Sequence, residues 1–417
     1  MMSSAASETQ STIELLKTRH DVKIKNARIL VVDDSDLIRE LICACLMTDG
    51  YFNISYAENG QDALEVIELQ VPDLIILDLE MPIMDGFELC KELRSRQSTA
   101  SIPILIQSGR DTAADITRAF DLGATDMIVK PIKKFEILAR TKVHLEHRFF
   151  VEKLTDFHDR VASELEQARQ LQLDICPSEE ELISFHSLYG LRIGWHYEPS
   201  SELGGDIGGI YPIDENRIAF YIADFSGHGV AAALNTFRMQ TWLSSSTSLY
   251  DQPDLLLKAL NQFLYQSLPR GSYATMLFGC LDLTNNVLEY SAAGTQPPLL
   301  KQSSAPFDSF SLLESKGMPL GLRPDWDYAV NIVDFPIGAQ LILYSDALVE
   351  VDLMDGGFLG EKGLEQEVNE IWKAYHEHSP SKSLSELIDR FHQRVGSHAD
   401  DDLTIIHIKN EGHANVV

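Results

Sequence analysis

The chain has 417 residues, of which 44% are hydrophobic and 23% are charged, a composition typical of globular rather than disordered protein. Its formal net charge of −29 argues against binding nucleic acid by phosphate neutralisation, which requires clustered Lys and Arg, and against binding an anionic membrane surface. The length is sufficient for two or three domains with separate cores.

Cysteine usage and the N-terminus indicate the cellular compartment. The five cysteines form no CxxC pair and no Cys/His cluster; they are Cys43, Cys45, Cys90, Cys176 and Cys280. We therefore expect reduced core thiols rather than disulfides or a zinc site. The N-terminus lacks a basic-then-apolar signal pattern, and no apolar run approaches membrane-spanning length, so we expect a cytoplasmic protein.

The first third of the chain alternates strand and helix patterns. Residues 1–26 are polar and Ser-rich and are expected to form a flexible tail. Over 27–143, short apolar runs are each followed by a helical segment; the runs are "RILVVDD", "NISYA", "DLIILDL", "IPILIQS" and "DMIVK". This alternation predicts an α/β domain with a doubly wound, five-stranded parallel sheet and helices on both faces.

A long helix is predicted next, inside a helical linker over 144–182. Over 144–175 the apolar residues are spaced by steps of three and four; they are Phe150, Leu154, Phe157, Val161, Leu165 and Ala168. This stripe is compatible with packing on the chain's own domains or with a parallel coiled coil between two protomers, and a single stripe does not choose between them. Cys176-Pro177-Ser178 is expected to end the helix.

The remaining part of the chain, 183–410, reads as strands separated by turns, followed by a tail at 411–417. The predicted strands include "RIGWHYEPS", "RIAFYIAD", "YATMLFGCLD", "NVLEYSAAG", "YAVNIVDF", "QLILYSD" and "LTIIHIK". Two helical stretches interrupt them, "GVAAALNTFRMQTWLSSS" and "PDLLLKALNQFLYQSL". This pattern predicts an α+β sandwich of antiparallel sheets flanked by helices.

In the first domain, polar residues lie at the carboxyl ends of the predicted strands, which face one crevice in a parallel sheet. They are Asp33 and Asp34 after the first strand, Asp78 after the third, Ser108 after the fourth and Lys130 after the fifth. Three converging carboxylates repel one another unless a hard cation is bound, and an all-oxygen set suits Mg²⁺. The added hydroxyl and ammonium suggest an acyl phosphate on Asp78, although any single Asp after a strand is also a common helix cap.

These residues make the domain similar to a response-regulator receiver. The resemblance implies that Asp78 is phosphorylated by a histidine kinase or a phosphotransfer protein. It also implies that Asp33, Asp34 and Asp78 bind Mg²⁺, and that Ser108 and Lys130 form the switch. Met127 stands where this family usually has an aromatic residue, which puts the usual aromatic switch in doubt.

A second set of acids occurs in the C-terminal region. Asp224 and Asp346 follow apolar strands, Asp401 precedes one, and Asp206 lies in the Gly-rich stretch "LGGDIGG". A carboxylate at the end of a buried strand favours a cation partner, whereas Asp206 is equally typical of a turn. Without nearby Cys or a His pair, the metals should be Mg²⁺ or Mn²⁺, and two such ions can activate water and hold a phosphoryl group.

Two other interpretations of this region fail. The stretch around Gly227 and Gly229 has no GxxxxGK[ST] pattern and no nearby Lys, which argues against a nucleotide P-loop. The "GGD" of residues 204–206 is followed by Ile207 and Gly208, not by the acidic and aromatic residues that a cyclic-dinucleotide synthase requires. His228, beside Gly227, is a candidate general base but is more typical of a plain loop residue.

Residues 165–408 resemble the PPM-type, metal-dependent Ser/Thr phosphatases, in the bacterial subgroup that acts on anti-sigma-factor antagonists. The motifs occur in family order; they are "ELEQARQLQLDICPS", "SSELGGD", "IADFSGHGVAAAL", "YATMLFGCLD", "AAGTQPPLL", "GMPLGL", "LYSDALVEV" and "DDDLTII". The resemblance implies a two-metal Mn²⁺ or Mg²⁺ site whose catalytic acids are Asp206, Asp224, Asp346 and Asp401. It implies the backbone carbonyl of Phe225 as a further ligand.

Four positions depart from the family pattern. Gly209 replaces a second Asp, Thr295 a His, Ala347 the Gly of "SDG", and Ala339 an Asp before the strand. None of the four removes a metal ligand. Ala347 adds only a methyl group, which is tolerated unless the backbone needs a positive φ.

The resemblances together predict a receiver that controls a metal-dependent protein serine/threonine phosphatase. Its expected substrate is a phosphoserine or phosphothreonine protein, an anti-sigma-factor antagonist in a partner-switching stress or envelope pathway. The alternatives are a non-catalytic adaptor that binds a sigma factor or its regulator, and a phosphatase that also serves as a phosphorylation-gated binding module. Retention of all four acids favours an enzyme over the adaptor.

Overall fold

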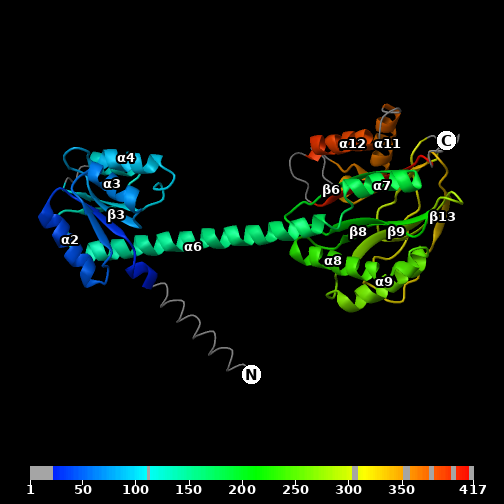
Figure 1. The fold of residues 1–417 in the computed structure, drawn as a ribbon, viewed down its shortest axis with the longest axis horizontal. Coiled ribbons are helices and arrows are strands. Elements are labelled where there is room, and N and C mark those ends of the chain that lie inside the picture. The colour runs from blue at the N-terminus through cyan, green and yellow to red at the C-terminus, as the bar shows by residue number, and fades with distance from the viewer. Residues whose placement is uncertain are drawn as a thin grey trace, which may run out of the picture. The chain divides into compact units, whose positions relative to one another are not determined.

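The computed structural model describes residues 22–109, 113–302, 309–350, 357–374, 380–395 and 401–412. The chain divides into two compact units at the boundary between Val161 and Ala162, and each is described by itself (Figure 1). None of the described helices is both long enough and apolar enough to cross a membrane.

The first unit has a parallel sheet in the order β2-β1-β3-β4-β5. Its elements are β1 (Ile29–Val32), α2 (Asp36–Thr48), β2 (Ile54–Ala57), α3 (Gly60–Leu69), β3 (Leu74–Asp78), α4 (Gly86–Ser95), β4 (Ile104–Ser108), α5 (Ala113–Asp121), β5 (Asp126–Val129) and the first part of α6 (Lys134–Leu173). The predicted doubly wound, five-stranded α/β sheet is confirmed.

Successive side chains along the strands point to opposite faces of this sheet, and both faces are packed with apolar residues. In β1, Leu30 and Val32 join the core beneath α3 and α4, whereas Ile29 and Val31 join the core beneath α2 and α6. This is the pattern of a parallel sheet that is covered by helices on both sides. The short stretch at residues 22–26 also contributes, because the side chain of Ile24 is buried in the second of these cores.

Helix α6 differs from the predicted connector. It begins at Lys134, ten residues before the predicted start at 144, and ends at Leu173 rather than at 175. The last helix of the first unit and the connector are one helix, because no Pro or Gly occurs between these ends.

The second unit contains two five-stranded sheets, ordered β13-β10-β9-β8-β7 and β12-β11-β14-β15-β6. The elements are α7 (Glu179–Tyr189), β6 (Leu191–Glu198), β7 (Asp206–Pro212), β8 (Arg217–Phe225), α8 (Val230–Ser244), the 3-10 helix η1 (Thr247–Leu249), α9 (Pro253–Ser267), β9 (Ala274–Asp282), β10 (Val287–Ala293), β11 (Leu299–Lys301), β12 (Ser311–Leu312), β13 (Asn331–Asp334), β14 (Gln340–Tyr344), α10 (Ala347–Glu350), α11 (Gly360–Ala374), α12 (Pro380–Val395) and β15 (Leu403–Asn410).

The two sheets pack face to face and helices cover their outer faces. Phe220 and Ile406 lie in the core between the sheets. Helices α8 and α9 cover the first sheet, and α11 and α12 cover the second (Figure 1). The predicted sandwich of antiparallel sheets flanked by helices is confirmed.

The prediction of two helical stretches in this region was incomplete, because α7, α10, α11 and α12 are also present. A start signal for α7 was visible in the sequence: Ser178 and Glu181 form a reciprocal capping box. In α11, Leu364, Val368 and Ile371 recur at helical spacing and are buried.

A buried amide in the first unit provides a test of this core. Neither polar atom of the Gln107 side chain has a hydrogen-bond partner, and the residue is fully buried in β4. We expect Gln107→Leu to raise the free energy of unfolding by about 1 kcal/mol, because it removes an uncompensated polar group from the core. Denaturation followed by circular dichroism measures this; exposed Gln97→Leu is the control, and a destabilised Gln107→Leu variant would contradict the expectation.

Candidate metal-binding sites

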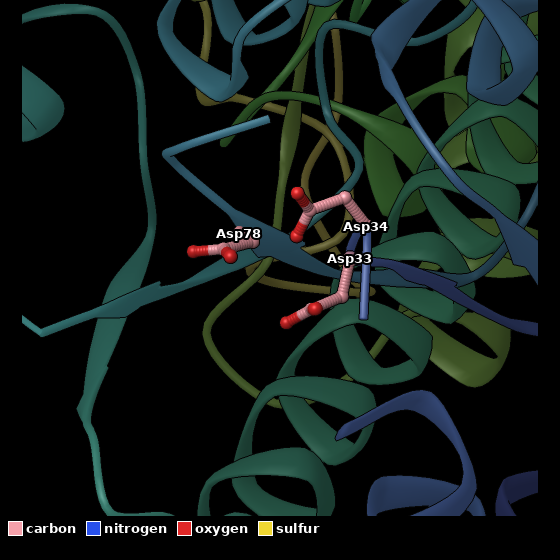
Figure 2. A group of neighbouring side chains, drawn as sticks. All are labelled: Asp33, Asp34 and Asp78. Atoms are coloured by element: carbon pink, nitrogen blue, oxygen red, sulfur yellow. The ribbon is translucent and has the colours of Figure 1, made fainter. Parts of the chain in front are cut away.

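The acids of the first unit meet at the carboxyl edge of its sheet. Val32 of β1 pairs with Leu77 of β3, so the next residues, Asp33 and Asp78, emerge side by side. Oxygens of Asp33, Asp34 and Asp78 all lie within 4.8 Å of one another, and Figure 2 shows the three carboxylates pointing to the same side. This all-oxygen set fits a hard divalent cation.

Lys130, which follows β5, supplies positive charge to the same site. Its Nζ donates to Asp78 Oδ2 at 2.7 Å and to Asp33 Oδ2 at 3.3 Å. Burial raises the pKa of the Asp78 carboxyl, although Lys130 acts in the opposite direction. Ser108, also buried, ends the neighbouring strand β4. The structure therefore brings the five predicted residues to one edge of the sheet.

The acids of the second unit come from both sheets. Asp206 begins β7 and is paired in register with Asp224 of β8, in the first sheet. Asp346 lies two residues after β14, and Asp401 lies two residues before β15; both strands belong to the second sheet. One cavity is lined by Asp206, Asp224 and Asp346, together with Thr275, Thr295 and Gln296.

Burial and mutual repulsion act on these acids. Burial, followed by the charges of Asp346 and Asp401, raises the pKa of Asp224 to about 8. Burial and the charge of Asp401 raise the pKa of Asp346 to about 6, and burial raises that of Asp401. The pKa of Asp206 is also raised, by burial first and by Asp224 second.

Repulsion between carboxylates raises their pKa values, and a bound hard cation would neutralise the charge that causes it. The residues therefore fit one or two divalent metal ions. They are arranged less tightly than the acids of the first unit. Within the described ranges, Asp33, Asp34 and Asp78 form the acidic group whose oxygens all approach within 4.8 Å, whereas Asp206, Asp224 and Asp346 of the second unit line a shared cavity.

Asp402 is a residue that the sequence reasoning missed. Only 3% of it is exposed, and its carboxylate accepts from the backbone N–H groups of Ser200 (2.7 Å), Gly205 (2.5 Å) and Asp206 (3.3 Å). Thr404, two residues later on the same side of the chain, donates from Oγ1 to Asp206 Oδ2 at 2.6 Å. The two-residue spacing of Asp402 and Thr404 was the available signal that their side chains lie on the same side of the chain.

The Phe225 carbonyl lies where the chain approaches itself closely. A Cβ at Gly205 would lie 2.9 Å from the Phe225 carbonyl oxygen, and the Phe225 N–H donates to the Gly205 carbonyl at 3.2 Å. Glycine is therefore required at 205, and the Asp206 loop and the end of β8 are held together.

Two of the departures from the family pattern have a structural explanation: Ala347 in its backbone conformation and Ala339 in its burial. Ala347 is a buried residue of helix α10, and the non-glycine residues with positive φ in the described ranges are Ile83 and Asn286, so the alanine is not strained. Ala339 is fully buried in the core between the sheets, where an ionised Asp would be costly.

Gly209 is explained by its surroundings, whereas the structure gives no explanation for Thr295. A Cβ at Gly209 would lie 2.5 Å from a ring carbon of Tyr221 and 2.7 Å from Tyr211 Oη, so the two rings leave no room for an Asp. Thr295 lines the cavity that Asp206, Asp224 and Asp346 share. His228 is exposed and interacts electrostatically with Asp401.

Two family models match separate parts of the chain. Residues 29–142 match the model described as response regulator receiver domain. Residues 214–411 match the model described as Stage II sporulation protein E (SpoIIE). The second match includes Asp224, Asp346 and Asp401 and begins after Asp206.

Similar proteins follow the same division. The response regulator MprA of Mycolicibacterium vanbaalenii is 39% identical over 118 residues, which are 28% of this chain and 50% of MprA. The chain thus spans about half the length of the curated relatives that it matches. The SiaA-PP2C domain of Pseudomonas aeruginosa is similar in fold, with 16% identity, a TM-score of 0.50, and coverage of 61% of this chain and 98% of that one.

The raised pKa values of these acids predict how the stability of the metal-free second unit changes with pH. Folded-state pKa values above the unfolded value near 3.8 mean that the folded state binds protons more tightly. With a chelator present, we expect the free energy of unfolding to fall as the pH rises from about 4 to about 8, and Mn²⁺ to restore it at pH 8.

Tryptophan fluorescence during denaturation measures this, because Trp195, Trp242, Trp326 and Trp372 all lie in the second unit. Asp224→Asn should flatten the pH dependence and weaken the Mn²⁺ effect. An equal pH slope in wild type and Asp224→Asn would show that these acids do not carry it.

Proposed function

Because this chain joins a response-regulator receiver domain to a PPM-type phosphatase domain of the SpoIIE family, we propose that it is a regulated, metal-dependent protein serine/threonine phosphatase. The observation that carries the proposal is the convergence of carboxylates from both sheets on one cavity, which is lined by buried Asp206 and half-buried Asp224 and Asp346. The charge of Asp401 acts on Asp224 and Asp346. The proposed metals are Mn²⁺ or Mg²⁺, held by these four acids and the Phe225 carbonyl.

The chemistry is hydrolysis of a phosphoserine or phosphothreonine ester. Bound divalent ions would supply Lewis-acid stabilisation of the phosphoryl oxygens and lower the pKa of the attacking water. The residues of the chain itself position the metal ligands. Thr404 orients the Asp206 carboxylate, and Asp402 holds the backbone of the Asp206 loop. Water adds to phosphorus, the P–O ester bond breaks, and the side-chain oxygen of the substrate leaves with a proton.

The receiver is proposed to control this site through phosphorylation of Asp78 by a histidine kinase or phosphotransfer protein. Asp33, Asp34 and Asp78 would hold Mg²⁺, and Lys130, which already contacts Asp78, would contact the added phosphoryl group. Ser108 would supply the switch hydroxyl. The resemblance to the SpoIIE family supports an anti-sigma-factor antagonist as the substrate and a partner-switching pathway as the setting.

Hydrolysis of a phosphoserine peptide with Mn²⁺, Mg²⁺ or chelator tests the enzyme. We expect turnover that depends on metal and falls by at least about 100-fold in Asp224→Asn, because a ligand to the catalytic metal is weakened. Asp327→Asn, which changes an exposed acid paired with Lys258, is the matched control and should retain wild-type activity.

Equal turnover in wild type and Asp224→Asn would contradict the proposed site. A folded chain that binds Mn²⁺ in the second unit but hydrolyses no phosphopeptide or phosphoprotein would support the adaptor function instead.

Labelling with a small acyl phosphate donor in the presence of Mg²⁺ tests the receiver. We expect incorporation of one phosphoryl group per chain, which is lost in Asp78→Asn and retained in Asp121→Asn, an exposed acid at the end of α5. Undiminished labelling of Asp78→Asn would assign the phosphoryl group to another residue.

The stripe on α6 is proposed to form a homodimer. Phe150, Leu154 and Phe157 are respectively 62%, 55% and 55% exposed, although they repeat at helical spacing. We expect Leu154→Asp/Phe157→Asp to convert a dimer into a monomer, since charges would enter the apolar seam. Light scattering after gel filtration measures the mass; Thr155→Asp, off the stripe, is the control, and a monomeric wild type would overturn the proposal.

A further inference from the structure

A second cavity of the second unit has a volume of about 330 Å³ and is separate from the one that the acids share. Its walls come from residues 174–177, helix α7 and strand β7, and none of the described residues lines both cavities. The volume is near the lower end of the range for pockets that bind small organic molecules. The cavity is therefore a candidate site for a small ligand.

Aromatic and aliphatic side chains form most of the lining. Phe185 and Tyr189 of α7 and Tyr211 of β7 contribute rings, and Ile175 and Leu188 contribute aliphatic surface. Phe185 and Tyr189 are one helical turn apart, with ring centroids separated by 5.8 Å. A lining of this kind suits a ligand with an apolar or aromatic body.

The aromatic walls are held in place by contacts outside the cavity. Tyr211 Oη accepts from Gln240 Nε2 at 2.6 Å, and its ring stacks on that of Tyr221 with centroids 6.2 Å apart. Tyr189 Oη donates to the Asp214 carbonyl at 2.9 Å. These rings are already ordered, so a ligand would not lose affinity by having to order them.

Gly209, one of the departures from the phosphatase pattern, permits this arrangement. A Cβ at this position would lie 2.7 Å from Tyr211 Oη and 2.5 Å from a ring carbon of Tyr221. An Asp at 209 would therefore displace the ring that forms one wall. Gly209 itself also lines the cavity. The departure thus accompanies a pocket that the usual residue would disturb.

The charge at the cavity is negative. Asp174 and Glu181 line it, and none of the described lining residues is Lys, Arg or His. The Glu181 carboxylate is fixed by its capping box, because Oε2 accepts from the Ser178 N–H at 2.8 Å and from Ser178 Oγ at 2.9 Å. The Cys176 thiol is uncharged at neutral pH, since burial raises its pKa to about 11. An ammonium group would meet carboxylates and ring faces here, whereas an anion would be repelled.

We propose that this cavity binds a small organic cation, with an ammonium group beside Asp174 and Glu181 and an apolar or aromatic body against Tyr189 and Tyr211. Asp174 and Glu181 are exposed, so the charged end of the ligand keeps contact with water. The inference does not rest on the proposed phosphatase activity, because it concerns a different cavity and needs no metal.

The experiment compares three probes of similar shape and different charge: phenethylamine, 2-phenylethanol and 3-phenylpropionate. Each is titrated by calorimetry into the full chain at pH 7 and about 0.15 M salt, which screens the general attraction of an acidic chain for cations. We expect phenethylamine to bind one site with a dissociation constant below about 1 mM, and about tenfold or more below that of 3-phenylpropionate, with 2-phenylethanol between them. Equal affinities, or no binding of phenethylamine, would overturn the proposal.

A tryptophan on α7 locates the site. Ser184 lines the cavity, whereas Ser187, also exposed on the same helix, does not. Ser184→Trp should fill the cavity and weaken phenethylamine binding by about tenfold or more, and Ser187→Trp should leave it within about twofold of wild type. Equal affinities of the two variants would place the ligand elsewhere and overturn the proposal. Should Ser184→Trp fail to fold, Leu188→Trp replaces it, because Leu188 also lines the cavity and is 63% exposed.

A pair of charge-matched variants tests the role of the carboxylates. Asp174→Asn/Glu181→Gln should remove most of the preference for phenethylamine over 2-phenylethanol and retain binding of the alcohol. Glu179→Gln/Glu180→Gln removes the same charge from exposed residues outside the lining and should preserve the preference. If both variants reduced the preference equally, the overall charge of the chain would account for it, and the assignment to this cavity would fail.

Discussion

The second unit is organised around carboxylates that would repel one another in the absence of a cation. Asp206 and Asp224 lie opposite each other in neighbouring strands, and Asp346 approaches from the other sheet. Burial and repulsion raise their pKa values, so the metal-free arrangement costs stability at neutral pH. The sandwich offsets this cost with a continuous core between its sheets.

The receiver handles a similar concentration of charge in a different way. Asp33 and Asp78 are buried beside each other, but Lys130 contacts both carboxylates. The Lys130 ammonium reduces the repulsion between the two carboxylates. It could also balance the negative charge of an added phosphoryl group, which suits a site proposed to gain and lose one. The second unit has no described counterpart of Lys130 in contact with Asp206, Asp224 or Asp346, which suits a site proposed to retain its metals.

Three of the four departures from the phosphatase pattern are adjustments of packing rather than losses of ligands. Gly209 is required by the rings of Tyr211 and Tyr221, and Ala339 fills a fully buried position between the sheets. Ala347 continues as helix and needs no left-handed backbone. The acids that face the cavity are unaffected by these three changes, so the chain presents an intact set of proposed metal ligands on a locally repacked scaffold.

Much of the fold and most of the candidate site residues were predictable from the sequence. Strand and helix periods predicted the parallel sheet and the sandwich, because alternation and the 3.6-residue repeat are local properties. The acids at strand ends were identifiable for the same reason. The helices α11 and α12 were missed although α11 carries a helical repeat, and the start of α6 was misplaced because the receiver was expected to end before the connector began.

Other features depended on contacts between residues far apart in the chain. Asp401 and Asp402 are the same residue type, and only the approach of the Asp206 loop in the folded chain brings backbone N–H groups to Asp402. Gln172 is one of several glutamines on a polar helix until the sandwich places Gly204 against it. The sequence by itself determined which residue types were available and with what period. The tertiary structure decided which of them share a cavity, because buried hydrogen bonds and charge repulsion act between neighbours in space rather than in sequence.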